Sequence, residues 1–240
     1  MANVLIEKQT MVDIANAIRE ESGTENAYLP AEMPQAIRNI QSIDTGVGSR
    51  QWWLDVCTNK TNFSYMFDNC SNITTIPQID TSQGTDFQFM FKNCVKLTTI
   101  PQIDTSKTTS FSSMFFGCEA LTTIPQLDLS NGANFGYMFF KCRALTTIPL
   151  IDTSKGTSFN QMFYGCTSLE NISFVANCIK KSISFAQSPL LIDESIQSII
   201  DGLVDLTGQT AQTITFHSDV KNKLTEEQIA QITSKNWTLA

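Results

Sequence analysis

The stretch FQFMFKNCVKLTTIPQIDTSKTTS, residues 87–110, is followed by FSSMFFGCEALTTIPQLDLSNGAN, residues 111–134, and the two align without a gap. Phenylalanine, methionine and cysteine recur at this 24-residue step in five successive units. A single fixed period indicates a solenoid, in which each unit packs only on its neighbours. The recurring residues are Phe63, Phe87, Phe111, Phe135 and Phe159, then Met66, Met90, Met114, Met138 and Met162, and finally Cys70, Cys94, Cys118, Cys142 and Cys166.

Each unit carries two structural signals. The apolar residues of 87–94 fall at i, i+3, i+4 and i+7, which predicts about two turns of α-helix. Leu97–Pro101 is β-branched and precedes a proline, which favours an extended strand. Asp104–Ser106 suits a helix cap or an Asx turn. The sequence therefore predicts an α/β solenoid with one short strand and one short helix per coil, the leucine-rich-repeat plan.

The repeat divides the chain. We expect a small N-terminal helical attachment module over 1–40, a linker over 41–50, the solenoid over 51–178 and a C-terminal capping region over 179–240. The inner faces of the attachment helices carry Met11, Ile14, Ile18, Met33, Ile37 and Ile40.

Caps are needed because a stack of repeats exposes apolar surface at its ends. Trp52, Trp53 and Leu54 are placed for the first cap. Beyond Cys166, four segments read as strands that extend the same sheet: 171–174, 182–185, 213–216 and 237–239. Between them, Ile192, Ile196, Ile199, Ile200 and Leu203 predict one amphipathic helix, and Leu224–Ile229 predicts the start of another with a threonine cap.

The unit FxxMFxxCxxLTTIPQIDTSxGT resembles the BspA-like leucine-rich repeats of bacterial surface proteins over roughly residues 60–178. The N-terminal text LIEKQTMVDIANAIREESGT and LPAEMPQAIRNI is similar to a helical module that heads tail and structural proteins of bacteriophages infecting Gram-positive bacteria. The ending FHSDVKNKLTEEQIAQITSKNWTLA is similar to those of phage-encoded repeat proteins, with Lys235-Asn236-Trp237 replacing a KGW-like turn. These resemblances imply a phage or prophage protein.

Composition excludes several classes of function. The chain has 23 acidic and 16 basic residues, a formal net charge of -7, and no long basic run, so nucleic acid is not an expected partner. No stretch approaches the ~20 apolar residues of a membrane span. No secretory signal opens the chain, so we expect synthesis in the host cytoplasm and a place in the virion.

No catalytic constellation is recognisable. The cysteines form one ladder without a CxxC pair, which favours buried free thiols over a zinc site. His217 is the only histidine and is expected at the surface as a structural residue. A row of aspartates suits turn capping, although it would also suit Ca²⁺ if carbonyl oxygens converged on it. We therefore expect neither an enzyme nor a bound cofactor. The row is Asp80, Asp104, Asp128 and Asp152.

Function is then expected at exposed positions that vary between coils. Aromatic residues there are candidates for a partner or receptor surface, or for packing on another copy or on the flanking helices. Neutral polar rows suit hydrogen bonding to glycans, although any solvated sheet face shows such rows. The aromatic candidates are Phe116, Phe140, Tyr164, Tyr65, Phe89 and Tyr137. The polar rows are Thr74, Thr98, Thr122 and Thr146, with Gln78, Gln102 and Gln126.

The sequence thus predicts a non-enzymatic tail or baseplate component that binds the bacterial host envelope through a rigid repeat surface. Its expected partners are other virion proteins through the N-terminal module, a cell-surface glycan or protein, and further copies of itself. The alternative is a virion structural or decoration protein whose repeats face other subunits. A bacterial surface adhesin and a glycan-degrading tail enzyme are weaker alternatives, the latter because no convergent acid pair is evident.

Overall fold

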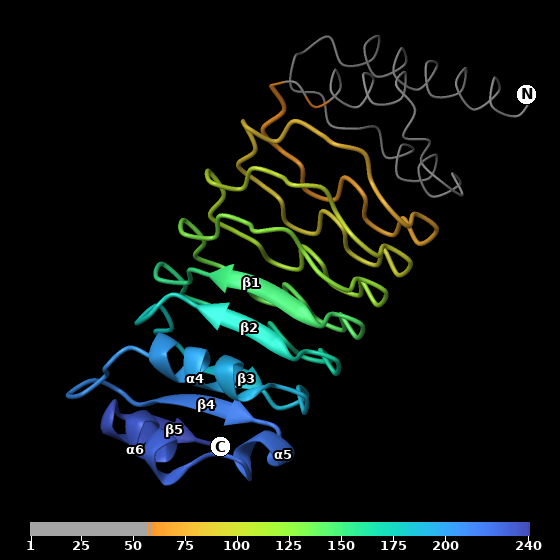
Figure 1. Ribbon diagram of the computed structural model, residues 1–240. Helices are drawn as coiled ribbons and strands as arrows, with labels where there is room; N and C mark the ends of the chain where they lie inside the picture. The colour runs from red at the N-terminus through yellow and green to blue at the C-terminus, as the bar shows by residue number, and fades with distance from the viewer. Residues whose placement is uncertain (1–56, 58) are drawn as a thin grey trace, which may run out of the picture.

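The computed structural model describes residue 57 and residues 59–240, and shows a repeat protein whose coils stack in a column (Figure 1). The expected attachment module, the linker and Trp52, Trp53 and Leu54 lie outside the described residues. The regular elements of the described part are β1 (Thr147–Ile151), β2 (Asn171–Phe174), β3 (Ile183–Phe185), α4 (Asp193–Gly202), β4 (Gln212–Phe216), α5 (Ser218–Lys221), α6 (Glu226–Ser234) and β5 (Trp237–Leu239).

The core is a set of side-chain ladders that run along the column. Each coil buries the predicted phenylalanines, methionine and cysteine, and rings at equivalent positions stack on one another. Phe91 lies 5.5 Å from Phe115, and Phe115 lies 5.6 Å from Phe139, with interplanar angles of 8° and 2°. The predicted period and core are therefore confirmed, and each coil buries its apolar face against the next.

The predicted helix in each coil is wrong. Residues 63–70 and their equivalents form consecutive turns, and within 59–192 the structure has no α-helix. In these turns, successive backbone N–H groups donate alternately to a carbonyl of their own coil and to a carbonyl of the next coil, so only about half of them bond within the coil. Those of Met66, Asp68 and Cys70 donate to carbonyls three residues back, whereas those of Phe63, Tyr65, Phe67 and Asn69 donate to the carbonyls of Asp86, Gln88, Met90 and Lys92 in the next coil.

Left-handed residues make this turn ladder possible. Tyr65, Phe89 and Tyr137 have φ values of 58°, 59° and 59°, a conformation that is uncommon for aromatic residues. A second left-handed position follows four residues later, for example at Asn69, with φ 58°. Such residues interrupt any right-handed helix, at roughly 1–2 kcal/mol each, and the hydrogen bonds between coils offset this cost.

On another side of each coil, the threonine-rich segment pairs in parallel with its neighbours. β1 and β2 form a two-stranded parallel sheet with Thr147 opposite Asn171, while Thr123 and Thr147 form an isolated parallel bridge. The predicted strand per coil is thus present as regular strand only at β1 and β2.

Helix α4 takes the place of the next strand beside β2. The predicted amphipathic helix is confirmed, and two of its serines, buried Ser195 and half-buried Ser198, meet the edge of the sheet. Ser195 Oγ accepts a hydrogen bond from the Ile172 N–H, and Ser198 Oγ accepts one from the Phe174 N–H, both at 2.9 Å. The hydroxyls replace the carbonyls of a missing strand, so this sheet is capped.

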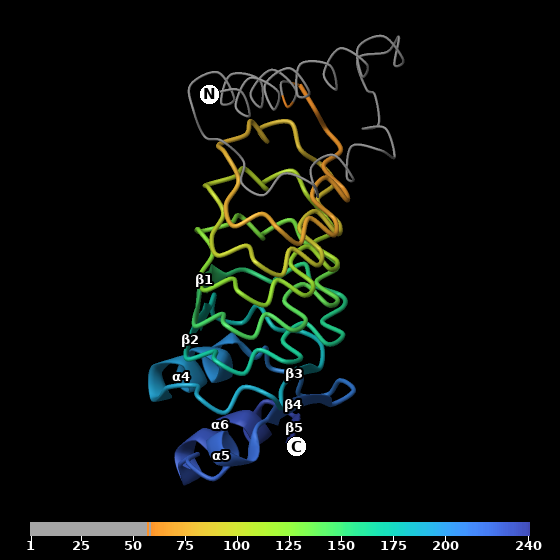
Figure 2. The same cartoon turned by 90° about the vertical axis from the view of Figure 1, so that its right-hand side faces the viewer.

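Of the four segments predicted to extend that sheet, 171–174 does so as β2, but the three later strands do not. β3, β4 and β5 form a separate parallel sheet in that order, on the other side of the column from β1 and β2 (Figure 2). The cause lies in the core: Phe185 stacks on Phe163 at 4.8 Å and faces Phe216 at 6.1 Å. The new sheet therefore continues the turn side of the coils.

Side-chain caps complete this end. α6 begins after Thr225 with a capping box to Gln228, which confirms the predicted threonine cap. His217 precedes α5, and its Nδ1 accepts from the Asp219 N–H at 3.2 Å, so the histidine is structural as expected. Asn236 supplies the tight turn with φ 61°, and Trp237 Nε1 donates to the Val204 carbonyl at 2.8 Å.

Glycine occupies the position where three of the coils return to the phenylalanine ladder, at Gly84, Gly132 and Gly156, and a Cβ there would lie against the ring three residues on. A Cβ on Gly132 would lie 2.3 Å from Phe135 Cζ. We expect Gly132→Ala to lower the free energy of unfolding by about 1–3 kcal/mol, because the ring must leave its stack. Denaturant titration followed by circular dichroism measures this. Gly136→Ala is the matched control, since its closest neighbour is Asn134 Oδ1 at 3.2 Å; equal losses would contradict the steric argument.

Candidate functional site

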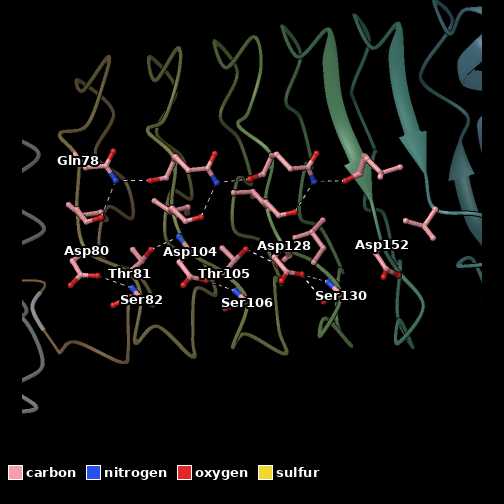
Figure 3. A pocket seen from close by; sticks show the side chains of 18 residues that line it. Gln78, Asp80, Thr81, Ser82, Asp104, Thr105, Ser106, Asp128, Ser130 and Asp152 are labelled. Carbon is pink, nitrogen blue, oxygen red and sulfur yellow. Dashed lines mark hydrogen bonds between the residues drawn. The ribbon is translucent and has the colours of Figure 1, made fainter.

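A polar groove of about 910 Å³ crosses the described coils and is the candidate binding site (Figure 3). It follows the segment in which each coil turns from the threonine-rich side toward Ser82 and its equivalents. Two rows that the sequence analysis had identified separately, the glutamines and the aspartates, lie side by side along it. Buried Ile79, Ile103 and Leu127 lie between them.

The glutamine row is fixed by the stack. The Nε2 groups of Gln78, Gln102 and Gln126 donate to the carbonyls of Gln102, Gln126 and Leu150, each at 2.7 Å. Each Nε2 also donates to the carbonyl of its own next residue, at 3.1–3.3 Å. Both N–H donors of each amide are thus used. No described residue donates to the Oε1 atoms, which are the groups that the amides offer to a ligand.

The aspartate row caps turns, as predicted. Oδ1 of Asp80, Asp104, Asp128 and Asp152 accepts the backbone N–H two residues on, at 2.8–3.0 Å. Hydrogen bonds from the Ser106 side chain and backbone lower the pKa of Asp104, so that this carboxylate stays ionised at neutral pH. Among the described residues, no group of three or more His, Cys, Asp or Glu side chains is placed to hold a metal ion.

The threonine row lies outside this groove. Oγ1 of Thr98, Thr122 and Thr146 donates to the carbonyl of the preceding threonine in the row, at 3.1–3.3 Å. These donors, like those of the glutamines, are used within the stack. The row lies on the exposed sheet face as predicted, and none of its residues lines the groove.

The aromatic candidates form a second surface, here called the aromatic ridge, made of Phe116, Phe140 and Tyr164. Phe116 and Phe140 stack at 4.5 Å, and Phe140 and Tyr164 at 4.9 Å. The predicted ladder is therefore present, on turns and not on a helix. Tyr164 is 43 % exposed, and the phenylalanines are partly buried.

The remaining aromatic candidates lie at the left-handed turn positions. Tyr65 stacks on Phe89 at 4.7 Å, and Tyr137 is tilted against Phe140 at 5.8 Å. Lys141 Nζ lies 5.5 Å from the centre of the Phe140 ring. Because the ridge rings stack face to face with one another, they present mainly their edges outward. A sugar ring, which packs on an aromatic face, finds little free face there.

The cysteines form no chemical site. All seven are free and buried, as predicted, and Cys94 Sγ lies 3.0 Å from the Phe67 carbonyl oxygen in the preceding coil. Burial raises the pKa of Cys57 and of Cys166 to about 12, so these thiols stay protonated and poorly nucleophilic.

We expect none of the seven thiols to react with Ellman's reagent in the native protein at mildly alkaline pH, and all seven to react in guanidinium chloride. Burial raises the pKa in the native state, so the reactive thiolate is absent until unfolding returns each group toward its usual pKa of about 8.5. Absorbance of the released thionitrobenzoate counts the thiols. Rapid reaction of one native thiol would contradict complete burial.

Sequence reasoning missed how the groove ends. Leu150 occupies the row position of the glutamines and is 50 % exposed, and Val175 beside it is 36 % exposed. The sequence contains a signal for this end, because leucine follows the proline at Leu150 where glutamine follows it in the earlier coils. The attachment residues Met11, Ile14, Ile18, Met33, Ile37 and Ile40 lie outside the described residues.

No helix within the described part of the chain has the length and apolar character to span a bilayer. A family model described as "Mycoplasma protein of unknown function, DUF285" matches residues 56–177. No curated protein and no solved structure gives a significant match.

Proposed function

The chain belongs to the DUF285 family, and we propose that it is a non-enzymatic binding protein that holds a glycan of a bacterial envelope in the polar groove. In this proposal the stack is a leucine-rich-repeat solenoid of the BspA-like kind. The protein acts as a tail or baseplate component of a phage or prophage virion.

The observation that carries the proposal is that the groove repeats the same hydrogen-bonding groups in successive coils. Three amide oxygens and four carboxylates line it, and their positions are fixed by bonds to backbone carbonyls and N–H groups. An extended polymer that itself repeats can bond in each coil. Weak contacts then add along the chain, and several copies on one particle would add avidity.

The virion part of the proposal is supported by the resemblance of the two chain ends to phage proteins. A second function, as a virion structural or decoration protein, is favoured by the aromatic ridge. Its rings are partly exposed, and edge-on aromatic rows suit packing against another protein subunit.

Sedimentation of the full chain with purified Gram-positive cell walls tests the binding function. We expect Gln102→Ala combined with Gln126→Ala to weaken wall binding by about tenfold, or roughly 1.4 kcal/mol, because two acceptors are lost from the groove. Phe140→Ser combined with Tyr164→Ser is the comparison and should leave wall binding unchanged. Thermal melting checks that both proteins fold.

If the ridge variant loses wall binding and the groove variant keeps it, the groove is not the site. Immunogold labelling of intact particles from the induced source prophage tests the location. Label at the tail tip agrees with host binding. Label on the head favours decoration, and unlabelled particles contradict a virion role.

A further inference from the structure

The groove offers a ligand hydrogen-bond acceptors. Each row glutamine has both amide N–H groups bound to backbone carbonyls, which leaves Oε1. Each row aspartate uses Oδ1 on the backbone, which leaves Oδ2. Side chains from two rows, on the same coils, thus face the ligand with oxygen atoms that accept and do not donate.

Of the three serines that line the groove, Ser82 accepts from Gln83 Nε2 at 3.5 Å and retains a hydroxyl donor, whereas the other two bond to aspartates. The Ser130 hydroxyl donates to Asp128 Oδ1 at 2.6 Å, and hydrogen bonds from Ser106 likewise hold Asp104. Lys107 lies at the rim, where its Nζ donates to the Ser82 carbonyl at 2.7 Å and to Gln83 Oε1 at 2.9 Å. Its charge is therefore held on neighbouring oxygens at the rim.

From this distribution of donors and acceptors we propose that the groove selects glycans that carry free, protonated amines over their N-acetylated or acidic counterparts. The inference rests on the proposed function and names the class of ligand. Sugar hydroxyls would donate to the amide oxygens, and ammonium groups would donate to the carboxylates, where charge assistance strengthens the bond. An acetamido group replaces the charged donor with a single neutral N–H and adds a carbonyl acceptor, and a carboxylate brings acceptors against acceptors.

A sugar chain suits the two rows better than a cationic peptide does. Each sugar unit carries hydroxyl and amine donors close to its ring, so one unit can reach an amide and a carboxylate of the same coil. Its C–H surface can pack on exposed Leu150 and Val175 at one end of the groove. A lysine presents one ammonium on a long flexible stem, which loses rotamer entropy on binding.

A matched pair of ligands tests the inference. Isothermal titration of the full chain compares a β1,4-linked glucosamine hexamer with the N-acetylglucosamine hexamer, at mildly acidic pH where amines are protonated and aspartates are ionised. We expect the glucosamine hexamer to bind about tenfold more tightly. We also expect higher salt to weaken it, because salt screens charged pairs.

Two variants assign the effect to the groove. Asp104→Asn with Asp128→Asn keeps each Oδ1 for its turn and removes the charge, and should abolish the preference between the two hexamers. Asp86→Asn is the matched control, because Asp86 caps an equivalent turn through the Gln88 N–H at 3.0 Å and lies outside the groove. Leu150→Lys, at an exposed position, should weaken the glucosamine hexamer without touching any turn.

Equal affinity for the two hexamers overturns the selection, while wall sedimentation that still depends on Gln102 and Gln126 leaves the proposed function standing. Failure of both hexamers to bind also overturns the inference, and loss of wall binding as well overturns the function. If an oligolysine of matched charge binds as tightly as the glucosamine hexamer, the groove reads charge alone and the glycan assignment is wrong.

Discussion

Backbone hydrogen bonds between residues 23 or 24 positions apart determine the rest of this structure. They join the turn side of each coil to the next, as between the Phe67 N–H and the Met90 carbonyl at 2.8 Å. Because they fix successive coils in register, equivalent side chains must lie directly above one another. Phenylalanine then meets phenylalanine, and the cysteines from Cys94 to Cys166 meet the equivalent carbonyl of the preceding coil. The core is ordered by this register as much as by its hydrophobicity.

The same register decides the chemistry of the surface. A polar side chain in one coil has a backbone carbonyl of the neighbouring coil within reach, and its donors bond there: Gln102 Nε2 and Thr98 Oγ1 both do so. What remains for a ligand is what the stack leaves unused, which is largely acceptors. The aromatic ridge follows the same rule, since stacking of Phe116 on Phe140 uses ring faces and leaves edges. Each row therefore offers a ligand different hydrogen-bonding groups or ring surfaces from those that its side chains would offer in isolation.

The sequence alone predicted the period, the buried residues, α4, the cap of α6 and the turn role of the aspartates, because these depend on spacing and residue type. It misassigned residues 87–94 as helix, since apolar residues at i, i+3, i+4 and i+7 also fit a ladder of turns. What distinguishes the turns from a helix is that every second N–H group bonds to the next coil, and the pattern of side chains does not show this. The sequence of a strand also does not reveal on which side of the column it lies. For this reason β3 was predicted in the sheet of β1 and β2, whereas it belongs to a separate sheet. The groove could not be predicted either, because the spacing of residues does not show that Gln102 and Asp104 line the same surface.

Departures from the repeat carry information that the repeat itself cannot. Thr108 stands where Gly84, Gly132 and Gly156 stand in other coils, and its buried hydroxyl has no hydrogen-bond partner in the described chain. It is a local imperfection that the stack tolerates. Leu150 is different, because it ends the row of glutamine amides. Its carbonyl accepts from Gln126, but its side chain has no amide to donate to the next coil. A row of identical units has no natural length, so under the proposed function the exposed apolar Leu150 at one end would limit the length of polymer that the groove binds.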